Sequence, residues 1–225
     1  MVRPQKHRLL PFIFLAGLLS SCSNVPPRIA GLYSQLALVN NLSERAVYEQ
    51  LSLFVQPDSE SRLSDIANVY VINDSAGLYW ALNPDTWEKR GGEGQFWIGS
   101  NDLVMPDGSP MPRGEYRVVM TDLAGARAET SFVLDQARTP ASELVFPSLK
   151  ISGSEISVSS PARSAEVTVL DPAGSFSARR EVSAGQVSID RIIGRPPEPG
   201  RRLDLYVNAY DQQHRLVLLT GPYAY

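Results

Sequence analysis

Short runs that alternate between apolar and polar residues constrain the fold of this chain more than any other feature. The run from Val47 to Val55 places Leu51, Leu53 and Val55 at every second position, which is the spacing of side chains on one face of a β-strand. Glycine, proline and aspartate separate this run from similar ones and mark turns. In the first half of the chain the pattern predicts strands over 47–55, 69–72, 78–82, 95–98, 114–120 and 129–134.

The second half of the chain repeats this organisation more densely. Seven short runs are separated by turn signals such as Asp171 to Gly174 and Arg195 to Gly200. So many short strands within about 80 residues favour a small β-sandwich over any α/β fold. The predicted runs are 148–152, 154–158, 165–170, 175–182, 186–189, 202–210 and 215–220.

Two segments do not follow the strand pattern. Ile29, Leu32, Leu36 and Val39 recur at helical spacing, which predicts a short amphipathic helix over 29–40. The glycine-rich run 89–94 superficially resembles a phosphate-binding loop but lacks the Gly-Lys-Ser/Thr ending, so it is predicted to be a connection between strands.

Charge divides the chain in two. Residues 31–139 carry 8 basic and 15 acidic side chains, whereas residues 140–225 carry 9 of each. The proline-containing stretch 135–142 lies at this change and is predicted to link two domains. The expected organisation is an all-β protein with two immunoglobulin-like β-sandwich domains in tandem, spanning 31–138 and 143–225.

The clearest hairpin lies in the first predicted domain. Gly114-Glu115-Tyr116-Arg117-Val118 is followed by the turn Asp122 to Gly125, and this pair of motifs resembles the last two strands of bacterial immunoglobulin-like and fibronectin-type-III-like domains. The resemblance implies that the Tyr116 hydroxyl bonds back to the backbone of a connecting loop, as in a tyrosine corner. The segments 78–88 and 97–101 also resemble a group of spirochaete lipoproteins of unassigned activity.

The N-terminus has the layout of a secretory signal. Arg3, Lys6 and Arg8 precede an apolar run of about eleven residues, which is too short to cross a bilayer. Leu19-Ser20-Ser21-Cys22 then resembles the lipobox of bacterial lipoproteins. The resemblance implies cleavage of residues 1–21 and acylation of Cys22 with fatty acids such as palmitate. Several acyl chains hold a protein at a membrane far better than one chain does.

The residues after Cys22 indicate where the anchored protein lies. Ser23 stands where the retention signal of Gram-negative lipoproteins has aspartate, so by the same resemblance the outer membrane is favoured, on a face that stays undetermined. Residues 22–30 are expected to be a short lipidated tether. After cleavage the chain carries 18 basic and 24 acidic residues, which argues against nucleic acid as a partner.

The sequence offers little catalytic chemistry. After cleavage, His214 is the one remaining histidine, and no Gly-x-Ser-x-Gly motif accompanies it. With one histidine and an acylated cysteine, the usual ligands for a zinc site are missing. We therefore expect no metal, no cofactor and no catalytic residues. A pair of acidic residues of the kind that glycosidases use stays an alternative, although the sequence singles out no pair.

Aromatic residues are concentrated in one stretch. All three tryptophans, Trp80, Trp87 and Trp97, fall within 18 residues, beside Tyr79 and Phe96. Exposed rings would form a platform for a sugar or a protein partner, whereas the alternation around Trp80 favours a place in the core. Trp87, Trp97 and Tyr79 are therefore the candidate contact residues.

These observations predict a non-enzymatic, lipid-anchored envelope protein that acts as a binding or assembly module. The membrane, through Cys22, and an envelope protein or glycan are its expected partners. A hydrolase that acts on envelope polymers through acidic residues of the first domain is the catalytic alternative, and a structural spacer is the third. An enzyme needs a cleft with two carboxylates of displaced pKa, and a binding module needs an exposed recognition surface.

Overall fold

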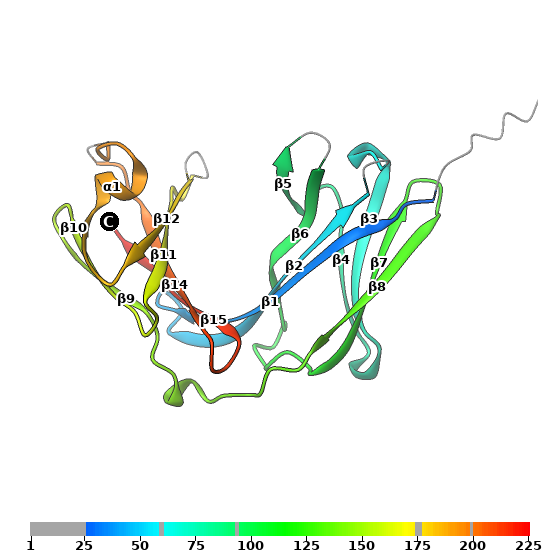
Figure 1. Ribbon diagram of the computed structural model, residues 1–225, viewed down its shortest axis with the longest axis horizontal. Coiled ribbons are helices and arrows are strands. Elements are labelled where there is room, and N and C mark those ends of the chain that lie inside the picture. The colour runs from blue at the N-terminus through cyan, green and yellow to red at the C-terminus, as the bar shows by residue number, and fades with distance from the viewer. Residues whose placement is uncertain (1–25, 59–60, 93–94, 174–176, 199) are drawn as a thin grey trace, which may run out of the picture.

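The computed structural model describes residues 26–58, 61–92, 95–173, 177–198 and 200–225. Across these residues the chain is all-β, as predicted, and its strands form three sheets. An eight-stranded sheet, in the order β12-β11-β14-β15-β1-β2-β6-β5, curves through the whole molecule. A four-stranded sheet, β4-β3-β7-β8, covers one end of its convex side, and a three-stranded sheet, β13-β10-β9, covers the other (Figure 1).

The first sandwich combines half of the large sheet with the four-stranded sheet. Its strands in the large sheet are β1 (Ile29–Asn41), β2 (Ala46–Pro57), β5 (Glu88–Gly92) and β6 (Gln95–Val104). The opposing layer holds β3 (Ile66–Asn73), β4 (Leu78–Leu82), β7 (Gly114–Asp122) and β8 (Arg127–Leu134). Leu51, Leu53 and Val55 all point into the core and are fully buried, as their alternation predicts.

The second sandwich is smaller. It places β11 (Ser164–Leu170), β12 (Ser177–Ser183), β14 (Asp204–Asp211) and β15 (Leu216–Ala224) in the large sheet. Opposite them lie β9 (Ser148–Ser152), β10 (Glu155–Ser159) and β13 (Gly185–Ser188). Short helices complete the chain: η1 (Leu63–Asp65), η2 (Asp74–Ala76), η3 (Ala141–Glu143) and α1 (Ile189–Ile193). Ile189 and Ile192 of α1 are buried in this second core.

The two sandwiches meet in a parallel strand pair. Residues Ala37–Asn41 of β1 pair with residues Val217–Gly221 of β15, so the first described strand and the last one lie side by side. Beneath this pair, Leu38, Leu216 and Leu218 form a separate apolar cluster that packs against Leu144 and Phe146. The segment that connects the sandwiches is thus held against the junction by apolar contacts.

The segment predicted to be a helix is a strand. Residues 29–40 lie within β1, which begins at Ile29, inside the expected tether. Leu36, Ala37, Leu38 and Val39 are each at most 8% exposed. A strand that is covered on both faces needs apolar residues on both faces. Its sequence then lacks the alternation of apolar and polar residues that identifies a strand. The run 89–94 is also partly a strand, because β5 pairs with β6 from Glu88 to Gly92.

Two sets of polar contacts fix the loop before β7. The Tyr116 hydroxyl donates to the carbonyl oxygen of Pro112 at 2.7 Å, which confirms the predicted tyrosine corner. The Arg113 guanidinium makes two 2.7 Å bonds with the Glu49 carboxylate on β2. The Arg113 and Glu49 side chains are only 19% and 11% exposed, and breaking such a shielded pair on one side costs about 3–5 kcal/mol.

The tyrosine corner generates a stability prediction. Burial raises the pKa of Tyr116 to about 12, whereas an unfolded tyrosine titrates near pH 10. We expect Tyr116→Phe to lower the free energy of unfolding by about 1 kcal/mol at pH 8, because the Pro112 carbonyl loses its donor. Stability from the neutral hydroxyl is fully present below pH 10 and is lost as pH rises toward 12. By pH 11.5 this loss reaches about 2 kcal/mol, so the difference between the proteins should change sign and Tyr116→Phe should become the more stable protein.

Urea unfolding of both proteins at pH 8 and pH 11.5 measures this effect. Tyr79→Phe is the matched control, because Tyr79 is 69% exposed and should behave as the original protein does. A difference between Tyr116→Phe and the original protein that is the same at both pH values would contradict the prediction.

Candidate functional site

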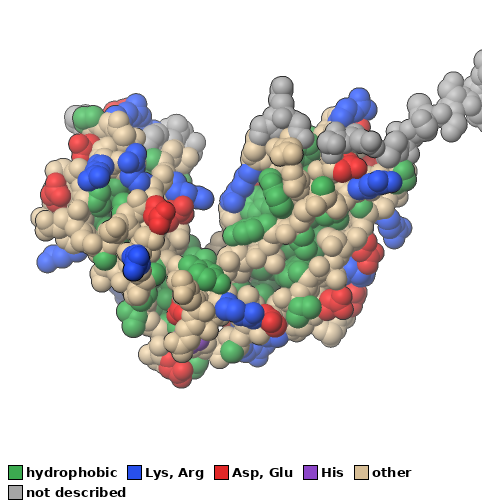
Figure 2. All heavy atoms as spheres, viewed as in Figure 1, with side chains coloured by type: hydrophobic (Ala, Val, Ile, Leu, Met, Phe, Trp, Pro, Cys, Tyr) green, Lys and Arg blue, Asp and Glu red, His purple; other side chains and the backbone are tan. Residues whose placement is uncertain are grey.

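The concave face of the eight-stranded sheet forms a cleft between the two sandwiches. Figure 2 shows this cleft as a deep notch between two lobes. In Figure 1 the large sheet lines both walls, β1 and β15 run side by side at the floor, and the edge strands β5 and β12 form the two rims. The cavity at the bottom measures about 370 Å³ and takes its lining from both sandwiches.

The wall of the first sandwich presents an aromatic and a cationic group. Tyr33 of β1 pairs across the sheet with Phe54 of β2, and the Arg90 guanidinium of β5 covers the Phe54 ring at 4.0 Å from its centroid. Phe54 is consequently only 2% exposed, whereas Tyr33 is 46% exposed. Arg90 also donates to the Glu88 carboxylate at 3.2 Å. This bond holds the guanidinium in place on this wall.

A glycine allows the strands of this wall to approach closely. A Cβ atom at Gly99 of β6 would lie 1.9 Å from the carbonyl oxygen of Leu53, a distance that no side chain can occupy. Next to it, Gln50, Ser52 and Asn101 line the cavity. The Asn101 side-chain nitrogen donates to the Glu88 carboxylate at 3.0 and 3.1 Å, which orients the amide.

The opposite wall carries a second set of polar side chains. Asn208 of β14 donates to the Glu166 carboxylate of β11 at 3.0 Å, and Arg179 of β12 lies 3.4 Å from the same carboxylate. Tyr206 and Thr168 are cross-strand partners beside them. Burial, and after it the negative charge of Asp204, raises the pKa of Tyr206, so its hydroxyl keeps its proton at neutral pH.

The floor of the cleft is apolar. Ala37 of β1 and Val217 of β15 are direct partners in the parallel pair, and Leu219 lies two residues further along β15. The floor therefore exists only because the two sandwiches share a sheet. Ligand sites combine apolar and aromatic surface with convergent polar groups, and most of the residues that line this cavity are polar.

The predicted aromatic residues do not form one platform. Trp80 and Trp87 are half-buried and pack against the first core, and the Trp80 indole donates to the Val104 carbonyl at 3.2 Å. Tyr79 precedes Trp80 on β4 of the four-stranded sheet, where it points to the opposite side and is exposed. Trp97 is the cross-strand partner of Arg90, so it lies on the concave face, where its ring contacts Gly31 and leaves no room for a Cβ atom there.

Other predicted positions have separate outcomes. Cys22 lies outside the described residues. His214 lies in the turn between β14 and β15, where its Nδ1 is 2.9 Å from the Asp211 carboxylate. In the described part of the chain, no group of three or more His, Cys, Asp or Glu side chains is placed to hold a metal ion. The described helices include none with the length and apolar character required to cross a membrane.

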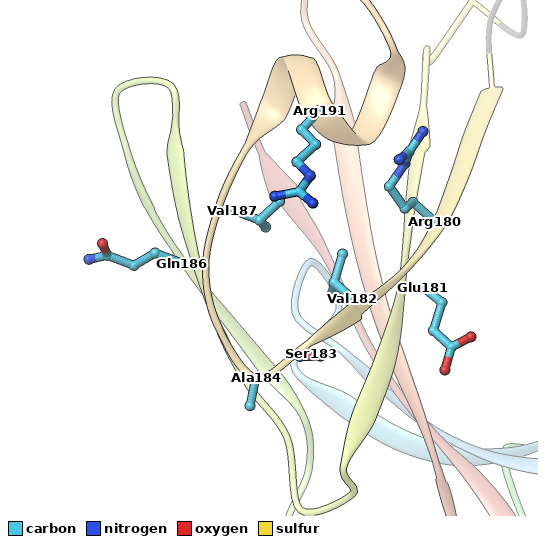
Figure 3. Close-up of a pocket in the computed structure, with 8 residues that line it drawn as sticks. All are labelled: Arg180, Glu181, Val182, Ser183, Ala184, Gln186, Val187 and Arg191. Carbon is cyan, nitrogen blue, oxygen red and sulfur yellow. The ribbon is translucent and has the colours of Figure 1, made fainter.

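A second cavity of about 310 Å³ opens at the edge of the second sandwich, between β12 and β13. Arg180 is the cross-strand partner of the buried Val167, so it stands on the core-facing side of the edge strand. Figure 3 shows Arg191 reaching from α1 toward Val187 at the mouth of this opening. Inward-pointing charges on an edge strand prevent pairing with other chains, which accounts for Arg180 without a ligand.

Comparisons with known proteins identify no family. No protein-family model matches the sequence, and no curated protein matches it. Among solved structures, the chain is similar to Tp47, the 47-kilodalton lipoprotein of Treponema pallidum, with 11% identity and a TM-score of 0.39 over 87% of this chain and 50% of that one. It is also similar to the FN1–FN3 domains of chicken CNTN1, with 13% identity and a TM-score of 0.25 over 89% of this chain and 64% of that one.

These likenesses are too distant for a shared activity to follow from them. The chain spans half the length of Tp47 and less than two thirds of the CNTN1 fragment.

The sequence did not point to the cleft residues. Tyr33 and Gln35 lie in the segment predicted to be a helix, and Arg90 in the segment predicted to be a loop. One signal was available. On the face opposite the core, β2 carries the polar residues Gln50 and Ser52 and β14 carries Asn208, which marks a face that does not pack into a core.

Proposed function

We propose that this chain is a lipid-anchored, non-catalytic binding module of the bacterial envelope that takes its ligand in the cleft. The carrying observation is the parallel pair between β1 and β15, which joins two sandwiches into one sheet and holds the cleft walls at a fixed spacing. A preformed site loses little conformational entropy on binding. A spacer would need neither a shared sheet nor polar groups from both lobes on its concave face.

The carboxylates of the cleft favour binding over hydrolysis. Glycosidic hydrolysis needs one carboxyl group that keeps its proton and a second that is ionised nearby. Glu88 is bonded by Arg90 and Asn101, and Glu166 by Asn208, with Arg179 at 3.4 Å. Both carboxylates are therefore engaged by the protein's own side chains, whereas a glycosidase presents its pair of carboxyl groups to the substrate.

The proposed anchor lies close to the first sandwich. Cys22 precedes Ile29, where β1 begins, by seven residues, and an extended chain spans at most about 3.3–3.6 Å per residue. The first sandwich would therefore stand within about 25 Å of the acylated end. Ser23, at the position where the retention signal of Gram-negative lipoproteins has aspartate, favours the outer membrane as the site of attachment.

Acylation is tested directly at Cys22. We expect Cys22→Ser to abolish incorporation of labelled palmitate in growing cells and to release the protein from the membrane fraction, because the acyl chains supply the attachment. Ser21→Ala is the matched control, since a small residue at that position keeps the signal intact. Continued labelling of the Cys22→Ser variant would overturn the anchor assignment.

The binding role is tested in the cleft. The full-length acylated protein, reconstituted in vesicles, is incubated with fractionated envelope material. We expect Tyr33→Ala combined with Gln35→Ala to reduce the retained material at least tenfold, because both side chains face the cavity.

Tyr79→Ala is the control on an outer face and should retain as much material as the original protein. Thermal unfolding of each variant verifies that the fold is intact. Equal retention by folded proteins with and without the cleft substitutions would contradict the binding role and favour a structural spacer.

A further inference from the structure

The polar side chains of the cleft leave a defined set of hydrogen-bond acceptors for a ligand. Four amides line the cavity: Gln35, Gln50, Asn101 and Asn208. Gln35 donates to the backbone carbonyl of Leu36 at 3.0 Å, and Gln50 donates to the backbone carbonyl of Asn101. The side chains of Asn101 and Asn208 donate to carboxylates. Because each partner can only accept, the nitrogen must be the bonded end of every amide.

The oxygens of these amides are therefore the ends left for a ligand. Among the described residues, no donor bonds the side-chain oxygen of any of the four. A ligand that fills the cavity has to supply donors to them, since a polar atom that is shut off from water without a partner costs about 1–3 kcal/mol. Hydroxyl groups meet this need, because each can donate and accept.

The charges of the cleft favour a neutral ligand. Arg90 is paired with Glu88, and Arg179 with Glu166. Each cation that lines the cavity is thus matched by a carboxylate at 3.2 or 3.4 Å. A polyanion would have to displace the carboxylates, and a cation would have to displace the arginines. A neutral molecule avoids both costs.

The tyrosine rings of the cleft favour a ligand that also has a flat apolar surface. Tyr33 on one wall is 46% exposed, and Tyr206 lines the opposite wall above the apolar floor. A tyrosine ring offers an apolar face and a polar tip. A sugar ring has the complementary character, with an apolar C–H face and hydroxyl groups at its edge.

The sheet also limits one mode of peptide binding. Strands β11, β14, β15, β1, β2 and β6 are each paired on both sides, so a peptide on the floor of the cleft cannot add to the sheet as a further strand, as it could at the rim strands β5 and β12. A volume of about 370 Å³ is near the lower end of ligand pockets, about 300–1,000 Å³.

We propose that the cleft binds a short segment of a neutral oligosaccharide, with its hydroxyl groups on the four amides and one sugar face on Tyr33. This inference rests on the proposed binding function and specifies its ligand. The recognised unit is a ring bearing hydroxyl or acetamido groups and no net charge, carried on an envelope polymer or free in solution.

The test uses the full-length acylated protein in a detergent without a sugar headgroup. Isothermal titration measures binding of chitopentaose and cellopentaose as neutral probes, and of an oligogalacturonate of equal length as the charged analogue. We expect at least one neutral probe to bind at least tenfold more tightly than oligogalacturonate. Tyr33→Ala and Gln35→Met should each weaken that binding at least tenfold, while Tyr79→Ala should leave it unchanged.

The outcomes separate the ligand class from the binding role. If neither neutral probe binds, or if oligogalacturonate binds as tightly, while cleft-dependent retention of envelope material persists, the sugar inference is overturned and the binding role stands. Identification of the retained material as protein would also overturn the sugar inference and leave the binding role in place. If the retention itself does not depend on the cleft, both proposals fail together. If the folded Tyr33→Ala variant binds the probe as tightly as the original protein, the probe binds outside the cleft and the assignment of this site is wrong.

Discussion

The parallel pairing of β1 with β15 is the interaction on which the rest of the structure depends. It joins residues 37–41 to residues 217–221, so two segments about 180 residues apart along the chain form the centre of one sheet. Without this pair, the chain would be two sandwiches on a linker. Domains joined that way move relative to each other by default. The pair and the apolar cluster of Leu38, Leu216 and Leu218 beneath it replace that freedom with a continuous sheet.

The chemistry of the cleft follows from this junction. A sandwich normally has one face of each sheet in the core and the other in water. Here the water-facing sides of two half-sheets turn toward each other across a shared floor, so polar groups such as Gln50 and Asn208 line one cavity. The amide nitrogens are bonded inside the protein, and among the described residues no donor bonds the amide oxygens. The proposed preference for a neutral donor of hydrogen bonds follows from this arrangement.

Sequence reasoning succeeded where one face of a strand is buried and the other is wet. The alternation from Val47 to Val55 and the hairpin around Tyr116 predicted β2, β7 and β8, and the tyrosine corner formed as expected. It failed at β1, whose residues 36–39 are buried on both faces. It also missed β5, whose residues Glu-Lys-Arg-Gly-Gly carry no apolar signal and whose cations Lys89 and Arg90 lie over the rings of Phe96 and Phe54.

The cleft itself was beyond local patterns, because it depends on a pairing between distant segments. The concentration of tryptophans suggested a recognition surface, yet Trp80 and Trp87 pack against the first core. Large rings that are close in sequence need not share a face, since successive residues of a strand point to opposite sides.

The most direct test of the account measures whether the two lobes are fixed. Spin labels at Ser131→Cys and Ser152→Cys, on the outer sheets of the two sandwiches, report the distance between lobes in the full-length protein. Cys22 is the one native cysteine, and its proposed acylation blocks it. Labels at Ser131→Cys and Gln95→Cys, both in the first sandwich, give the width expected of a rigid body. The account predicts one distance distribution between the lobes, as narrow as that within the sandwich; a broad or multiple distribution would contradict it.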